Sequence, residues 1–196
     1  MDLQFEHATG TVTIAAGDLH VVFSRRGDRY GHEVRCARVE DRTLLASVEG
    51  TAEDPWPPSP PFQELHVEQR GDKQVALLVG RAGRSHWSLS VDPDLADGSL
   101  VFDVACRSSA AMDWLGSTYR IAGAKAARSL GDGRFLFASG YELHVSAGGV
   151  EVEQAGEERR LRIAARSEHS HTPQTVRWRY RLAPVAVAPW PALEPV

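Results

Sequence analysis

Apolar and polar residues alternate with a period of two along much of the chain, and this rhythm limits the possible folds more than any other feature. In residues 86–91, Trp87, Leu89 and Val91 alternate with polar side chains. Residues 99–106 repeat the pattern. Successive side chains of a β-strand point to opposite faces of its sheet, so this pattern predicts half-buried strands.

Four such runs follow one another in the middle of the chain, at residues 63–69, 73–81, 86–91 and 99–106. Turn-forming residues separate them, which predicts a four-stranded antiparallel meander. In the second run, Val75, Leu77 and Val79 share one face. Similar short runs flank the meander. The expected fold is all-β, an antiparallel β-sandwich of about a dozen short strands with little helix.

Three segments depart from this rhythm. Residues 122–130, followed by Gly131, could form one short helix with a glycine cap. Residues 54–62 are rich in proline, so we expect them to be extended and to stay outside any central strand. Prolines recur near the C-terminus. We therefore expect one sandwich domain over residues 1–182 and a proline-rich tail over residues 183–196.

Composition narrows the classes of partner. Hydrophobic residues make up 42% and charged residues 24%, which is typical of a globular domain. The net charge of −4 argues against a nucleic-acid partner. No apolar run approaches the ~20 residues that span a bilayer, and the N-terminus does not resemble a signal peptide, so we expect a soluble, cytoplasmic protein. Phosphate-loop and dinucleotide fingerprints are missing, and we expect no cofactor.

The two cysteines, Cys36 and Cys106, both lie in alternating apolar runs. They are expected to be small core residues with free thiols, and a disulfide between them requires that their strands meet.

Arginines form the most regular polar row. Arg177, Arg179 and Arg181 alternate with aromatic and aliphatic residues, so they share the face opposite the core. Guanidinium groups bind oxygen atoms, so this row predicts a surface for an anionic or polyhydroxylated ligand. Alternatively, the row is a solvated sheet face whose arginines pair across strands with acidic residues, namely Glu64, Glu68 and Asp103.

Histidines supply the other candidate chemistry. Glu64 and His66 share a strand face and, together with His86, are candidates for acid–base catalysis or ligand contact. His169 and His171 have the spacing of a metal-binding pair, similar to the cupin arrangement. The glutamate that follows the histidine pair in cupins is absent, and a solvent-facing polar row near a turn explains the same spacing.

Two parts of the chain resemble a galactose mutarotase-like β-sandwich. They are residues 79–91 with 98–104, and the early residues 19–23 with 31–34, together about a third of the chain. The resemblance implies a twisted sandwich with a carbohydrate-facing side. Family members with epimerase activity use a histidine acid and a glutamate base, but their His-Pro-Tyr-Phe-like motif has no match here. A reduced, non-catalytic version of the fold is the implied reading.

Three functions remain open from the sequence. The first is a non-catalytic binding domain for a carbohydrate or a protein partner, which uses the arginine row with Glu64 and His66. The second is a sugar-modifying enzyme with Glu64 and His66 or His86 as its acid–base pair. The third is a cupin-like metal-dependent enzyme with His169, His171 and a glutamate.

Overall fold

Two antiparallel sheets form the fold in a computed structural model of the chain, which describes residues 10–38, 43–111, 113–122, 127–137, 139–155, 158–165 and 173–185. The expected β-sandwich is confirmed, and the described residues form fifteen strands. In spatial order, the seven-stranded sheet contains β1 (Thr11–Ala16), β2 (Leu19–Arg26), β3 (Arg29–Cys36), β4 (Thr43–Ser47), β9 (Gly116–Ile121), β14 (Glu158–Ala164) and β13 (Val150–Ala155).

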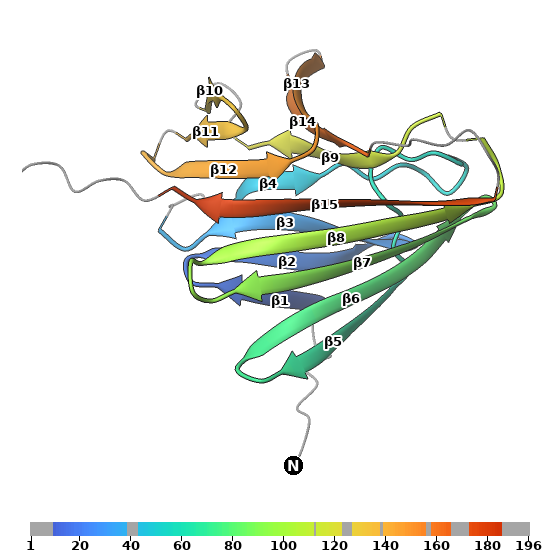
Figure 1. The fold of residues 1–196 in the computed structure, drawn as a ribbon, viewed down its shortest axis with the longest axis horizontal. Coiled ribbons are helices and arrows are strands. Elements are labelled where there is room, and N and C mark those ends of the chain that lie inside the picture. The colour runs from blue at the N-terminus through green and yellow to red at the C-terminus, as the bar shows by residue number, and fades with distance from the viewer. Residues whose placement is uncertain are drawn as a thin grey trace, which may run out of the picture.

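The eight-stranded sheet contains the candidate residues that the sequence indicated and the structure describes. In spatial order, its strands are β10 (Arg128–Gly131), β11 (Arg134–Leu136), β12 (Glu142–Ala147), β15 (Gln174–Pro184), β8 (Ser99–Ser108), β7 (Ser85–Asp94), β6 (Lys73–Ala82) and β5 (Glu64–Arg70). The order β8-β7-β6-β5 confirms the predicted meander, and Figure 1 shows this sheet lying across β2 and β3 of the other sheet.

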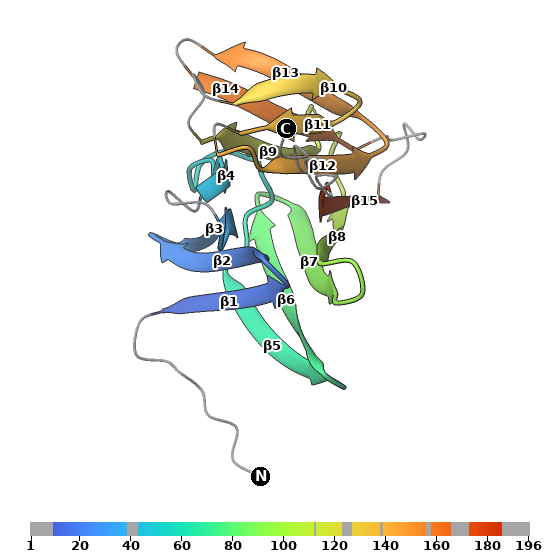
Figure 2. The ribbon, with the colours of Figure 1, turned by 90° about the vertical axis from the view of Figure 1, so that its left-hand side faces the viewer.

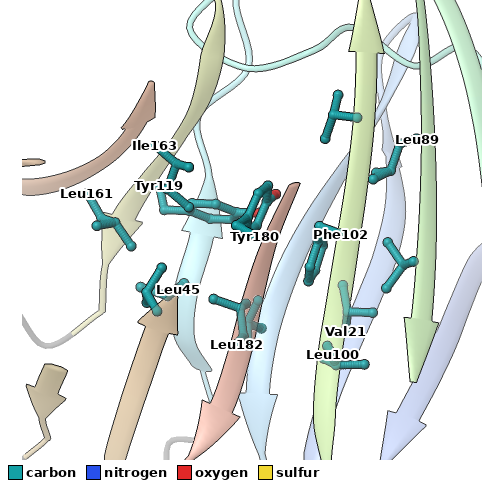
Figure 3. Close-up of a cluster of buried hydrophobic side chains, with 14 of the residues drawn as sticks. Val21, Leu45, Leu89, Leu100, Phe102, Tyr119, Leu161, Ile163, Tyr180 and Leu182 are labelled. Carbon is teal, nitrogen blue, oxygen red and sulfur yellow. The ribbon is translucent and has the colours of Figure 1, made fainter. Parts of the chain in front are cut away.

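The core lies between the two sheets, where the alternating apolar residues meet. Figure 2 shows β2, β3 and β4 on one side of this interior and β7, β8 and β15 on the other. Phe102 of β8 stacks on Tyr180 of β15, with ring centroids 4.8 Å apart. Leu45, Leu161 and Leu182 enclose the same region (Figure 3). Because both sheets contribute apolar faces, neither can leave the other without exposing the interior to water.

Tryptophans close one part of the core. Trp87 is 3% exposed and Trp178 is 6% exposed, and their rings meet edge to face at 6.2 Å. Trp56, from the proline-rich segment, contacts Trp87 at 6.5 Å. Trp87 and Trp178 are therefore core residues, as their alternation predicts, while Trp56 holds the proline-rich segment against them.

The proline-rich segment passes from the seven-stranded sheet to the eight-stranded sheet. It stays outside the central strands, as predicted, and hydrogen-bonds to β3 and β9 of the seven-stranded sheet. Ser59 Oγ donates to the carbonyl of Thr118 at 2.8 Å and accepts from the Thr118 amide at 3.0 Å. Gly80 of β6 allows a close approach, because a Cβ there would lie 1.8 Å from the carbonyl oxygen of Pro61. The side chain of Phe62 is then buried in the core.

One local prediction was wrong. The expected helix over residues 122–130 is not formed at its C-terminal end, because Arg128–Gly131 is strand β10. Asp132 and Gly133 follow with φ angles of 47° and 72°, and these positive values permit the two-residue turn into β11. β15 continues to Pro184, two residues beyond the expected end of the sandwich at residue 182.

The apolar triplet of β6 lies on the strand face opposite Ala76 and Leu78, and within it Val75 is fully buried whereas Val79 is exposed. Val75, Leu77 and Val79 alternate with Ala76 and Leu78, and it is the latter two that pair with core residues of β7. Both faces of β6 carry aliphatic side chains, so alternation alone does not tell which one is buried. As a result, Val79 is 48% exposed on the outside of the eight-stranded sheet.

Candidate functional site

The outer face of the eight-stranded sheet, meaning the side turned away from the core, carries the predicted arginine row. Trp178 and Tyr180 point inward from β15 and are buried, so Arg177, Arg179 and Arg181 point outward between them. The pairing of β15 with β8 places Arg179 opposite Asp103 and Arg181 opposite Val101. The predicted face is therefore correct.

The three arginines differ in their partners. Arg177 binds Asp103 with both branches of its guanidinium, and its Nε lies 2.6 Å from Oδ1. Arg181 binds Asp97 and lies 3.4 Å from Asp94 Oδ2. Among the described residues, Arg179 has no hydrogen-bond or ion-pair partner. Arg177 and Arg181 thus form ion pairs, whereas the guanidinium of Arg179 is available to a ligand.

Arg179 lines a hollow on this face, which we call the first hollow. It has a volume of about 370 Å³ and crosses from β15 over β8 and β7 to the turn before β6. The other lining residues are Asp72, Lys73, Asp92, Pro93, Asp94, Leu95 and Val101. Its floor is therefore mixed, with charged groups beside an aliphatic patch.

Most of the charges in the first hollow neutralise one another. Lys73 Nζ lies 2.6 Å from Asp92 Oδ1, and Asp94 faces Arg181. Among the described residues, neither Asp72 nor Arg179 forms an ion pair. The hollow therefore offers a fixed array of ion pairs with one available donor group and one available acceptor group. Leu95, at 46% exposure, adds an apolar contact at the rim.

Glu64 and His66 lie on the same outer face but far from the arginines. Both belong to the edge strand β5, and three strands separate it from β15. With neighbouring strands about 4.8 Å apart, they are roughly 19 Å from the row. Their side chains are exposed and line neither hollow described here. The candidate residues thus share one sheet face, with Glu64 and His66 at its β5 edge and the arginines on β15.

His86 stands apart from both groups. It lies on β7, opposite Arg107 of β8 and Arg81 of β6, and it is exposed. Neither Glu64 nor His66 is its cross-strand neighbour, since β6 lies between β5 and β7. The described structure therefore separates His86 from Glu64, whereas Glu64 and His66 are neighbours on one face of β5.

The metal candidates His169 and His171 lie outside the described residues. In the part of the chain that is described, no group of three or more histidine, cysteine or acidic side chains is placed to hold a metal ion. Cys36 and Cys106 are buried free thiols on different sheets, as expected for core residues. Burial raises the pKa of Cys106 to about 12, so this thiol is protonated and unreactive at neutral pH.

A second hollow, which the sequence did not indicate, lies beside β12. It has a volume of about 510 Å³, and its lining includes Asp132, His144 and Ser146 with the glycines 133, 148 and 149. Ser146 Oγ lies 3.5 Å from His144 Nε2. Ser146 pairs with Arg181 across β12 and β15, so it shares the outer face with the arginine row. Only this strand pairing reveals the neighbourhood, because residues 146 and 181 are distant in sequence.

A buried hydrogen-bond network of three side chains crosses the core but is closed to ligands. His32 Nε2 lies 2.8 Å from the Tyr119 hydroxyl, which lies 2.6 Å from that of Tyr180. Burial lowers the pKa of His32 to about 3 and raises the pKa of Tyr180 to about 12, so both are neutral at pH 7. His32 is 6% exposed and Tyr119 is fully buried. This hydrogen-bond network therefore links the two sheets and does not form an accessible site.

Comparison with protein-family models, curated proteins and solved structures finds no match for this chain. The site is therefore interpreted from its own geometry. Among the described residues, no helix has the length and apolar character needed to cross a membrane.

Proposed function

We propose that this chain is a non-catalytic binding domain and that the first hollow binds a carbohydrate. The observation that carries the proposal is the open guanidinium of Arg179 at the edge of a hollow whose other charges are largely paired. A guanidinium presents several N–H donors in a fixed plane, which suits sugar hydroxyls and carboxylates. Asp72 supplies an acceptor at the other end of the hollow.

The apolar part of the hollow supports the same ligand class. Pro93, Leu95 and Val101 lie among the charged groups. A sugar ring has hydroxyls around its edge and C–H groups on its faces, so it can use both kinds of contact at once. The ion pairs Lys73–Asp92 and Arg181–Asp94 fix several polar groups before binding. Such preorganisation lowers the entropy lost when a ligand is held.

A screen of neutral and acidic sugars by thermal shift, followed by titration calorimetry, tests the proposal. The informative variant is Arg179→Ala. Its control is Arg84→Ala, which removes an exposed arginine from the turn at the far end of β6 and β7. We expect a sugar to bind the wild type and the control alike and to lose about tenfold or more in affinity with Arg179→Ala. Equal affinity in all three proteins contradicts the proposed site.

The second candidate function is a sugar-modifying enzyme, and one observation favours it. His144 and Asp132 line the second hollow together, which gives a base and a carboxylate in one concave place. Glu64, His66 and His86 line neither of the two hollows. An epimerase assay with the wild type and with His144→Ala separates the two functions. Turnover by the wild type that is lost in His144→Ala would show that the chain is a sugar-modifying enzyme.

A further inference from the structure

The two hollows lie next to each other on one face. The first ends at Arg179 of β15, and the second begins at Ser146 of β12. Ser146 is directly opposite Arg181, so Arg179 and Ser146 are diagonal neighbours across β15 and β12. Diagonal neighbours on one sheet face are roughly 7–8 Å apart, so no strand lies between the hollows. Figure 1 shows β12 and β15 side by side in the sheet.

The ion pairs leave the passage between the hollows open. The Arg181 side chain binds Asp97, in the connection between β7 and β8, and lies 3.4 Å from Asp94 of the first hollow. Its guanidinium is therefore drawn away from β12. Ser146 remains exposed, and Arg179 has no described partner that would draw its side chain across the gap. A ligand that contacts Arg179 can thus continue over β15 to Ser146 and His144.

We infer that the two hollows are parts of one groove, which binds an extended oligosaccharide rather than a single sugar. This inference rests on the proposed function and specifies its ligand class. The groove crosses β6, β7, β8, β15 and β12, perpendicular to the strands. It ends at Asp72 on one side and at the turn of Asp132 and Gly133 on the other.

The residues along this groove suit a repeating polar chain. Asp72 and Arg179 offer an acceptor and donors in the first hollow, and His144 and Ser146 offer further hydrogen-bonding groups in the second. Each part on its own provides few contacts. A ligand that occupies both gains the second set without a second loss of translational freedom, so its affinity rises with length.

Calorimetry with two oligosaccharide series tests the inference. The probes are chito-oligosaccharides and oligogalacturonides from one to six sugar units, added to the full chain. We expect affinity for one series to rise about tenfold or more between the short and the long members. Ser146→Trp, which fills the second hollow from an exposed position, should abolish that gain and leave the affinity of the short members unchanged. Ser88→Trp is the control, since Ser88 is exposed on β7 and lines neither hollow.

The possible failures are distinguishable. Equal affinity for short and long members, or a Ser146→Trp variant that keeps the full gain, overturns the inference while the proposed function stands. No binding by any member of either series overturns the inference, and a sugar screen that is also negative overturns the proposed function. Length-dependent binding of an extended peptide in place of the sugars also overturns the assignment of an oligosaccharide. Circular dichroism of each variant verifies that loss of binding does not reflect loss of the fold.

Discussion

Arg177 takes the carboxylate that lies opposite Arg179. The backbone pairing places Asp103 directly across from Arg179, but both branches of the Arg177 guanidinium bind Asp103 from the diagonal position. Arg179 is thereby left without a described carboxylate partner at the edge of the first hollow. The availability of Arg179 for a ligand thus depends on an ion pair that the ligand does not touch.

This arrangement predicts an indirect effect of Arg177 on binding. Arg177→Ala should free Asp103 to pair with Arg179, and this new pair should weaken sugar binding even though Arg177 lies outside the hollow. The double variant Arg177→Ala/Asp103→Ala should restore the wild-type affinity, because Arg179 is then open again. Titration calorimetry on the three proteins measures the effect. Unchanged affinity in the single variant would show that Asp103 does not control Arg179.

Trp87→Ala is expected to be one of the most damaging core substitutions. The side chain is 3% exposed and contacts both Trp178 and Trp56. Its removal leaves a cavity between the two sheets and loosens the proline-rich segment, at a cost of about 3–5 kcal/mol. Urea unfolding measures this loss. Val79→Ala, at a 48% exposed position, should change the free energy of unfolding by less than about 0.5 kcal/mol.

The buried His32 makes stability depend on pH. Its folded pKa is about 3, below the usual 6.5, because burial disfavours the charged ring. As the pH falls, His32 is therefore protonated in the unfolded chain before it is protonated in the folded one. The contribution of neutral His32 to the free energy of unfolding is fully present above pH 6.5, and it decreases as the pH falls toward 3. Between pH 7 and pH 4 this loss is about 3 kcal/mol.

His32→Phe tests this linkage. The variant keeps an aromatic ring among Phe23, Phe102 and Tyr119, and it removes the titrating group. Its free energy of unfolding should fall less steeply than that of the wild type between pH 7 and pH 4. Parallel curves for the two proteins would mean that His32 does not titrate on unfolding.

Gly80→Ala tests the approach of the proline-rich segment to β6. The added methyl would lie 1.8 Å from the Pro61 carbonyl oxygen and 2.8 Å from the Phe62 Cα, and both are backbone atoms. Relief of the clash requires movement of the segment, so we expect a loss of stability of at least about 1–3 kcal/mol. Gly148→Ala is the matched control, because nothing lies within 4 Å of its Cβ position. Thermal unfolding of both variants measures the difference.

The sequence predicted most strands because their two faces differ. In β7 and β8 every second residue is apolar, so alternation identified both the strands and their buried sides. The same rule could not orient β6, where Ala76 and Leu78 face the core while Leu77 and Val79 lie on the outer face. The orientation of β6 is set by its neighbours, and these are a tertiary property.

The candidate site was only half predictable. Alternation placed Arg177, Arg179 and Arg181 on one outward face, but it could not tell which of them is open. That distinction depends on the β15–β8 register and on the position of Asp103. The second hollow was missed because Ser146 and Arg181 meet only through the pairing of β12 with β15. Short-range sequence patterns contain no information on such pairings.

The most direct test of the binding face is an NMR titration of the ¹⁵N-labelled chain with the oligosaccharide that binds best. We expect amide shift changes at Asp72, Asp92, Val101, Arg179 and Ser146. Amides of β1 and β2 in the other sheet should stay unchanged. Shift changes centred on β1 and β2, with none around Arg179, would contradict the assignment of the outer face of the eight-stranded sheet as the binding surface.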